Sequence, residues 1–334
     1  MDYFKKLESL EKLNQTPLNL KGVLSQFYYS YKKAIESNGL SITMLDPLLN
    51  EFLDFVENQL KNPYKFEPFH QCIREPIDYY KFGLDFIKPL VKLEESKVLN
   101  SHYVDEIQKF LLNGENVILL ANHQTEPDPQ AISILLEKTH PKLAEEMIFV
   151  AGHRVTSDPL CIPFSMGRNL LCIFSKKHIN IPPEKMVEKQ QHNQRTMMRM
   201  KELLTEGGKC IYVAPSGGRD RLNSQGYIEV AKFDSQSIEM FSLMAKQSKK
   251  PTHFYPLALS TYNLLPPPHI TEKEIGEERH ATCTPIHLCF NKEIEMDDFP
   301  GSEGLDKRGK REARAEYIWN IVREDYRKLE ALQK

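Results

Sequence analysis

The most informative stretch of the chain is Val117-Ile118-Leu119-Leu120-Ala121-Asn122-His123-Gln124-Thr125-Glu126-Pro127-Asp128, in which an aliphatic run leads directly into a polar loop. A short aliphatic run of this kind is typical of a strand that is buried on both faces. Similar apolar runs occur at 148–151, 170–174, 209–214, 253–259 and 286–290, and helical patterns lie between them at 129–138, 184–206 and 235–248. This alternation predicts an α/β fold with a mixed, largely parallel central sheet flanked by helices.

The first 75 residues have a different pattern. Apolar residues recur every three or four positions from Leu20 to Ile35 and again from Leu48 to Leu60, which is the spacing of amphipathic helices. A stretch rich in proline and aromatic residues follows at 61–76. We therefore expect a small N-terminal helical bundle over residues 1–75 and a larger α/β domain over residues 76–334, which ends in a charged amphipathic helix at 309–333.

Composition excludes several classes of protein. The chain has 334 residues, and its 44 Lys and Arg against 46 Asp and Glu give a net charge of −2, which disfavours a protein that binds nucleic acid over its whole surface. No apolar run approaches the roughly 20 residues that span a bilayer, and we expect a soluble protein. The six cysteines form no CxxC pair, so reduced thiols in a cytosol-like compartment are expected.

His123 and Asp128 form the first candidate for chemistry. A histidine that leaves a strand and an aspartate five positions later can meet across a tight loop, where the carboxylate fixes the imidazole tautomer and stabilises the imidazolium. Asp128 followed by Pro129 also resembles a helix N-cap, and the two roles are compatible. The same His-x4-Asp spacing occurs at His153 and Asp158, again after an expected strand, so spacing alone does not choose between the pairs.

Two groups of cations follow expected strands. Lys176-Lys177-His178 comes after the run at 170–174, and Ser216-Gly217-Gly218-Arg219-Asp220-Arg221 comes after the run at 209–214. The glycines allow backbone amides to approach an anion closely, and arginine side chains bind phosphate oxygens in pairs. These features favour a phosphate site, although an ordinary solvated loop is the alternative for either group.

Ser216 has a competing interpretation. The sequence Ala214-Pro215-Ser216-Gly217-Gly218 approximates the G-x-S-x-G turn that presents a nucleophilic serine, with alanine in place of the first glycine. That turn must lead directly into a packed helix, whereas the charged residues 219–221 follow here. We therefore do not expect a serine nucleophile.

Together these segments carry a specific resemblance. Residues 122–128, 164–170, 175–178 and 213–221 resemble, in order, the conserved blocks of the soluble glycerol-3-phosphate 1-acyltransferases, a family found in plant chloroplasts and in chlamydia-like bacteria. The resemblance covers about 115–260 and implies a helical bundle followed by an α/β acyltransferase domain. It selects His123 and Asp128 over His153. The wider superfamily has glutamate at the position of Ser216, and the plastid-type enzymes, like this chain, lack that glutamate. The serine therefore argues against membership of the membrane-bound branch, which acylates 1-acylglycerol 3-phosphate.

The resemblance implies an activity. A fatty acyl group would pass from a thioester of acyl carrier protein or coenzyme A to the sn-1 hydroxyl of glycerol 3-phosphate, giving 1-acyl-sn-glycerol 3-phosphate, the first step of phospholipid synthesis. His123 would be the general base and Asp128 its support, with no covalent intermediate, metal or other cofactor. The residues implied in phosphate binding are Lys177, His178, Arg219 and Arg221, with Ser216, Gly217, Gly218 and Arg168 in supporting roles.

The implied partners leave alternatives open. An acidic acyl carrier protein could dock on the basic residues of the helix at 184–206, which otherwise form an ordinary solvated face. Peripheral membrane contact is compatible with a lipid product. The acyl chain would occupy a tunnel built from the elements around 130–175. Either a plastid stroma or a bacterial cytoplasm fits, and the N-terminus, which begins with Met and shows no transit peptide, favours the latter. The rivals are a 1-acylglycerol-3-phosphate acyltransferase and a non-catalytic lipid- or phosphate-binding protein.

Overall fold

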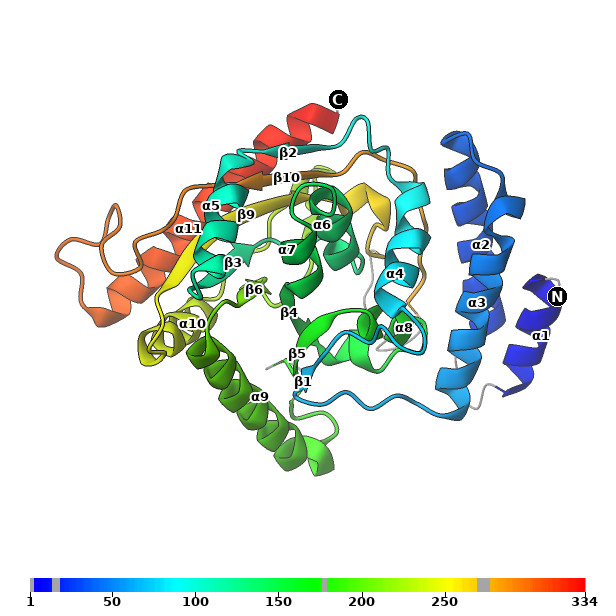
Figure 1. Ribbon diagram of the computed structural model, residues 1–334, viewed down its shortest axis with the longest axis horizontal. Coiled ribbons are helices and arrows are strands. Elements are labelled where there is room, and N and C mark those ends of the chain that lie inside the picture. The colour runs from blue at the N-terminus through cyan, green and yellow to red at the C-terminus, as the bar shows by residue number, and fades with distance from the viewer. Residues whose placement is uncertain (1–2, 14–18, 176–178, 269–276, 334) are drawn as a thin grey trace.

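The computed structural model describes residues 3–13, 19–175, 179–268 and 277–333. In this part of the chain a single large sheet has the strand order β1-β5-β4-β6-β3-β9-β10-β2 (Figure 1). Its strands are β1 (Phe69–His70), β2 (Lys97–Leu99), β3 (Asn116–Ala121), β4 (Ile148–Gly152), β5 (Asn169–Ile173), β6 (Cys210–Val213), β9 (Thr252–Ser260) and β10 (His287–Phe290). The strands from β5 to β9 in this order are parallel, β10 is antiparallel to β9, and β1 is antiparallel to β5. The mixed, largely parallel sheet is confirmed.

Helices cover both faces of the sheet, as the buried strand runs require. Alternate residues of β3 face opposite ways: Val117 and Leu119 pack on the side of α5, α6 and α7, whereas Ile118 packs on the side of α9, α10 and α11. These helices are α5 (His102–Leu112), α6 (Asp128–Leu136), α7 (Pro141–Glu146), α9 (Met186–Glu206), α10 (Ser235–Gln247) and α11 (Lys307–Glu330). All of β3 is buried, because each face of the strand contributes to a separate hydrophobic cluster.

The N-terminal helices stand beside the sheet (Figure 1, blue). They are α1 (Tyr3–Leu13), α2 (Leu20–Ser37) and α3 (Ile42–Lys61), and they pack against α4 (Tyr79–Ile87) and α8 (Ile162–Met166). Phe52 of α3, Phe86 of α4 and Phe164 of α8 form a triangle of rings with centroids 5.1 to 5.6 Å apart. The helices expected at 20–35 and 48–60 are confirmed, and one hydrophobic cluster joins them to α4, α6 and α8.

Short elements complete the chain, and several were not expected from the apolar pattern. Strand β2 has three residues and β1 two, too few for a recognisable alternation. The remaining elements are η1 (Lys88–Leu90), η2 (His153–Thr156), η3 (Pro183–Lys185), β7 (Arg221–Leu222), β8 (Ile228–Glu229), η4 (Tyr262–Leu264) and η5 (Ala331–Gln333). The charged C-terminal helix is confirmed as α11, where Trp319 donates a hydrogen bond to the carbonyl of Val230 (3.1 Å).

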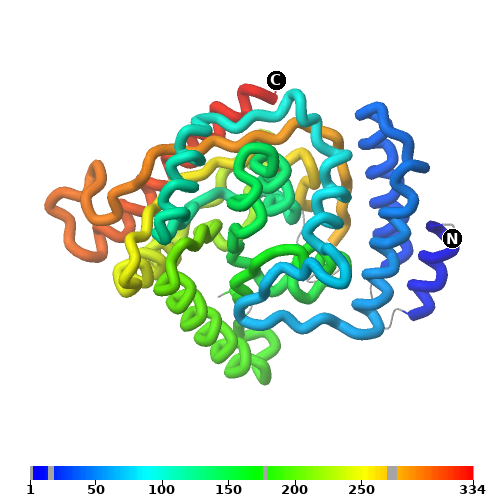
Figure 2. Tube along the Cα trace, viewed as in Figure 1, coloured from blue at the N-terminus to red at the C-terminus, as the bar shows by residue number. Residues whose placement is uncertain are grey.

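The carboxyl ends of the parallel strands lie at one edge of the sheet, and Figure 2 shows the path of the chain through these segments. His123 follows β3, Arg154 lies in η2 directly after β4, Arg219 follows β6, and Thr261 follows β9. Because the carboxyl ends of neighbouring parallel strands meet at the same edge, side chains from four distant stretches of sequence gather there.

Candidate active site

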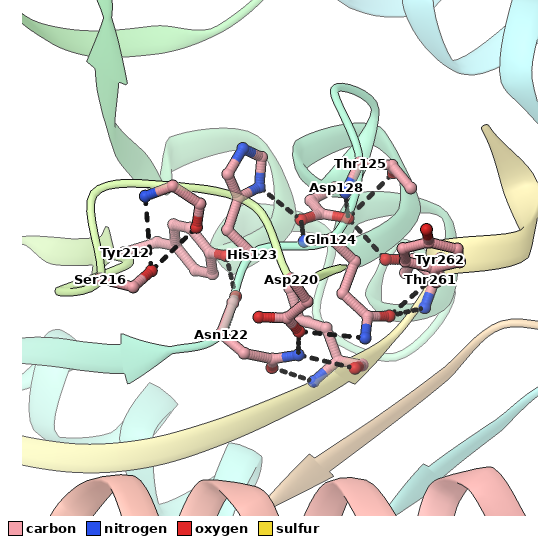
Figure 3. A network of polar contacts seen from close by, with 12 residues as sticks. Asn122, His123, Gln124, Thr125, Asp128, Tyr212, Ser216, Asp220, Thr261 and Tyr262 are labelled. Carbon is pink, nitrogen blue, oxygen red and sulfur yellow. Dashed lines mark hydrogen bonds and ion pairs between the residues drawn. The ribbon is translucent and has the colours of Figure 1, made fainter. Parts of the chain in front are cut away.

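The structure brings His123 and Asp128 together (Figure 3). Nδ1 of His123 lies 2.7 Å from Oδ2 of Asp128, the distance of a charge-assisted hydrogen bond. Asp128 is fully buried, whereas the His123 side chain is 32% exposed. The carboxylate is therefore held inside the protein while the imidazole faces the space in which a substrate can bind.

Four further donors surround the carboxylate of Asp128. The backbone amides of Gln124 and Thr125 donate to it at 2.8 and 3.2 Å, the hydroxyl of Thr125 at 3.0 Å, and the hydroxyl of Thr261 at 2.5 Å. The helix α6 begins at Asp128 itself, so the carboxylate accepts from amides upstream rather than capping the helix as expected. A buried carboxylate needs such donors, and together they fix its orientation toward His123.

The second His-x4-Asp pair has a different environment. His153 lies in η2 and packs its ring against Phe174, with centroids 5.4 Å apart. Asp158 accepts from the backbone amide of Leu160 and from Arg279, each at 2.9 Å. The carboxylate of this pair thus belongs to an ion-pair network with Arg279.

Asp220 joins two loops of the site and was missed by sequence reasoning. Its carboxylate accepts from Asn122 (2.8 Å), Gln124 (3.2 Å) and the amide of Ala231 (2.9 Å), and its own amide donates to the carbonyl of His123 (2.7 Å). Burial raises the pKa of Asp220 to about 6. The residue lies between the two arginines of 219–221, and it fixes them against the loop that carries the histidine.

Four arginines, Arg154, Arg219, Arg221 and Arg279, form what we call the arginine cluster. Arg219 donates two hydrogen bonds to Glu277, at 2.6 and 2.7 Å, and Arg154 lies 3.1 Å from the same carboxylate. Nη1 of Arg221 is buried and has no hydrogen-bond partner among the described residues. Burial and the neighbouring Arg219 lower the pKa of Arg221. Arg154 and Arg219 thus share the carboxylate of Glu277, whereas the expected Lys177 and His178 lie outside the described residues.

Arg279 connects the cluster to the loop between His123 and Asp128. Its guanidinium donates to both carboxylate oxygens of Glu126, at 2.6 and 3.1 Å. Burial alone would raise the pKa of Glu126, but Arg279 lowers it to about 2. Neither Glu277 nor Arg279 carried a motif, and only their place in the fold identifies them.

The remaining expected residues lie in two places. Gly217 has a φ of +63°, a backbone conformation that favours glycine, and the Ser216 hydroxyl donates to the Gly218 carbonyl (2.9 Å). The short strand β7 rather than a helix follows this turn, so the strand-turn-helix geometry of a nucleophilic serine is missing from these residues. Arg168 donates to Ser133 (2.6 Å) and lies deep in the protein.

A pocket lined mostly by apolar side chains begins beside His123. Its walls come from the N-terminal helices and α4 on one side and from β4 and α8 on the other. The lining includes Val23, Leu24, Phe27, Phe52, Phe86, Phe149, Val155, Leu160, Phe164, Leu264 and Arg168. Part of the pocket lining falls in the range 130–175, in which an acyl tunnel is expected, and the rest comes from residues well before and after that range.

Comparison with known proteins shows which family the chain resembles. Residues 96–260 match the acyltransferase family model. The chain is 40% identical to the chloroplastic glycerol-3-phosphate acyltransferase of Spinacia oleracea over 326 residues, 96% of this chain and 68% of the relative. The chloroplastic glycerol-3-phosphate acyltransferase of Arabidopsis thaliana is 39% identical, over 95% of this chain and 70% of its own. This chain belongs to the chloroplast-type glycerol-3-phosphate acyltransferase family.

Membership of the glycerol-3-phosphate acyltransferase family confirms the resemblance drawn from the sequence blocks. A chloroplastic relative from Cucurbita moschata is 39% identical, over 94% of this chain and 71% of its own. Among the described residues of this acyltransferase, none of the helices combines the length and the apolar character needed to cross a bilayer.

Proposed function

We propose that this acyltransferase moves a fatty acyl group from a thioester to the sn-1 hydroxyl of glycerol 3-phosphate, giving 1-acyl-sn-glycerol 3-phosphate. One observation carries the proposal beyond family membership: the hydrogen-bonded His123 and Asp128 lie next to both an apolar pocket and the arginine cluster. These are the two environments that an acyl chain and a phosphate require.

His123 acts as the general base. Because Nδ1 donates its hydrogen to Asp128, the lone pair of the neutral imidazole is on Nε2. Nε2 takes the hydroxyl proton as the substrate oxygen attacks the thioester carbonyl carbon. The tetrahedral intermediate then collapses, the carbon–sulfur bond breaks, and the imidazolium returns the proton to the leaving thiolate. Such base catalysis contributes about 10²–10⁴-fold, and no covalent enzyme intermediate is needed.

The phosphate of the acceptor binds to Arg219 and Arg221, with Lys177 and His178 as further cations and the turn at Ser216-Gly217-Gly218 in support. A phosphate monoester carries about −1.5 to −2 charges at neutral pH, so paired guanidinium contacts hold it strongly. Fixing the phosphate orients the sn-1 hydroxyl toward His123, which lowers the entropic cost of the reaction.

The acyl chain lies in the apolar pocket between the N-terminal helices and the sheet domain. Ring and aliphatic side chains such as Phe27, Phe52 and Phe164 line it, and burying a chain of methylene groups against them is favourable by about 0.8 kcal/mol for each group. The bundle at residues 1–75 would thus contribute to substrate binding.

Acyl carrier protein is the donor that we favour, and it would dock on α9. Lys185 at the N-cap of α9 and Arg195 and Lys201 within it are exposed. Of the other two basic residues expected on this face, Lys189 is buried and Arg199 already pairs with Glu202. Docking of an acidic carrier on this face predicts a KM for acyl carrier protein that rises with salt. A KM that does not change between low and high salt would contradict docking at α9.

The decisive experiment is a product assay. Glycerol 3-phosphate is offered with oleoyl and palmitoyl thioesters of acyl carrier protein and of coenzyme A, and products are identified by mass spectrometry. We expect 1-acylglycerol 3-phosphate from the wild type and none from His123→Ala, which should still bind glycerol 3-phosphate. Acylation of 1-acylglycerol 3-phosphate instead would establish the rival acceptor.

His153→Ala is the matched control for His123→Ala. Both changes remove an imidazole five residues before an aspartate at the same edge of the sheet. We expect turnover by His153→Ala within a few-fold of the wild type. A loss equal to that of His123→Ala would contradict the choice of base.

A further inference from the structure

The carboxylate of Glu277 lies between two guanidinium groups from different loops. Arg219 comes from the turn after β6 and contacts both carboxylate oxygens, at 2.6 and 2.7 Å. Arg154 comes from η2 after β4 and lies 3.1 Å from one of them. Glu277 is 4% exposed, so this anion is enclosed by the site and does not extend into solvent.

Two guanidiniums that converge on one small anion define an anion site, because their spacing is already set for a group of that size. A carboxylate offers two oxygens and one charge, whereas a phosphate monoester offers three terminal oxygens and nearly two charges. The same pair of arginines can therefore hold a phosphate more strongly than it holds Glu277.

The charges of the site agree with this exchange. Among the described residues, the arginine cluster forms ion pairs with the carboxylates of Glu126, Asp158 and Glu277. Turning the Glu277 side chain away removes one negative charge from contact with Arg154 and Arg219, and a bound phosphate brings nearly two negative charges in its place.

Glu277 can leave without disturbing the rest of the segment. Two residues further on, Arg279 is held by Glu126 and by Asp158 (2.9 Å), and it also donates to the backbone carbonyl of Glu277 (2.9 Å). These contacts fix the backbone of the segment. A rotation of the Glu277 side chain would then open the contact with Arg154 and Arg219 while the backbone stays in place.

We propose that Arg154 is a further phosphate-binding residue for glycerol 3-phosphate, and that Glu277 is an internal counter-ion which the phosphate displaces. This inference rests on the proposed function, and it adds to it a residue and an exchange. It also explains selectivity: an acceptor without a strongly charged group cannot compete with Glu277, so uncharged glycerol would be excluded.

Calorimetric titration of the full chain with glycerol 3-phosphate, and separately with inorganic phosphate, tests the exchange. Glu277→Gln keeps the side-chain shape and removes the competing charge, and we expect both ligands to bind at least about tenfold more tightly. Glu278→Gln makes the same change at an exposed neighbour and should leave both affinities unchanged. Equal affinity of Glu277→Gln and the wild type would overturn the role of Glu277.

Arg154 is tested in the Glu277→Gln background, in which the charge of Glu277 no longer competes with the ligand. Adding Arg154→Gln should weaken binding of both ligands at least about tenfold, whereas adding Arg327→Gln, at an exposed position of α11, should not. Thermal melting of each variant establishes that it is folded.

Unchanged binding after loss of Arg154 would overturn its role, even if the wild type acylates glycerol 3-phosphate. If the wild type gives no product but phosphate binding follows the expected order, the proposed function fails and the anion site stands.

Discussion

Arg279 donates two hydrogen bonds to the carboxylate of Glu126, which lies in the loop between His123 and Asp128. The two residues are far apart in sequence, and each is largely buried, with 11% and 17% of its side chain exposed. The contact therefore links the segment that precedes β10 to the loop that carries the proposed base.

Removing one partner of this ion pair should destabilise the protein more than replacing both partners. We expect Arg279→Met to lower the free energy of unfolding by about 3 kcal/mol, because the buried charge of Glu126 loses its partner. The double variant Arg279→Met with Glu126→Gln should recover part of the loss. Urea denaturation of the wild type, both single variants and the double variant measures the coupling, and strictly additive losses would contradict it.

Thr261 should position the catalytic pair without touching the substrate. Its hydroxyl donates to Asp128 at 2.5 Å, so Thr261→Val leaves the buried carboxylate one donor short. We expect kcat to fall about tenfold, corresponding to about 1.4 kcal/mol, while the KM values of both substrates stay within about twofold. Thr261→Ser retains the hydroxyl and should restore turnover; a serine variant as slow as the valine variant would point to packing instead.

Arg219→Ala should separate the two substrates kinetically. Under the proposed function the variant removes paired contacts to the phosphate, and we expect the KM for glycerol 3-phosphate to rise about 10- to 100-fold. The KM for the acyl donor should change far less, because the proposed place of the acyl chain is the apolar pocket. Steady-state kinetics with each substrate varied in turn give both values, and equal increases would argue against a phosphate role.

His253 should make stability depend on pH. It lies between Glu293 at Nδ1 and Glu115 at Nε2, each 2.7 Å away, and stacks on Phe110. Burial would lower the pKa of His253, but its hydrogen bonds to the two carboxylates outweigh burial and raise it above 6.5. The stabilisation is thus complete below the unfolded pKa of about 6.5 and is lost as pH rises through the folded pKa.

The comparison for this prediction is His253→Gln, which cannot carry the charge. We expect the wild type to melt at a higher temperature than the variant at pH 6, and the difference to shrink toward zero as the pH rises to 9. Melting curves of both proteins across that range measure it. A difference that stays constant with pH would show that the charge of His253 contributes nothing.

The parts of the fold that sequence predicted best are those with local signals. The run 117–121 identifies a buried strand because all of its residues are apolar. His123 and Asp128 meet because only a short loop separates them. Thr261 and Asp220 contact this loop from segments that follow β9 and β6, two strands that pair with β3 only in the folded sheet. Their contacts depend on strand order, which the apolar pattern leaves open.

The sequence likewise did not assign several other residues to the site. Glu277 and Arg279 lie in a stretch without apolar periodicity, and Phe27 belongs to a helical stripe that has the same spacing whether it faces a core or a pocket. Short elements such as β2 are formed by pairing with a neighbour rather than by their own composition.

The pocket wall that α2 and α3 supply comes from a different part of the chain than the groups that carry out the reaction. Val23 and Phe52 contribute side chains to the pocket, whereas the proposed base and phosphate ligands all follow strands of the sheet. Under the proposed function, the preference for one fatty acid over another can diverge between lineages through substitutions in these helices alone. The membrane lipids of an organism could then adapt while the chemistry that makes them stays the same.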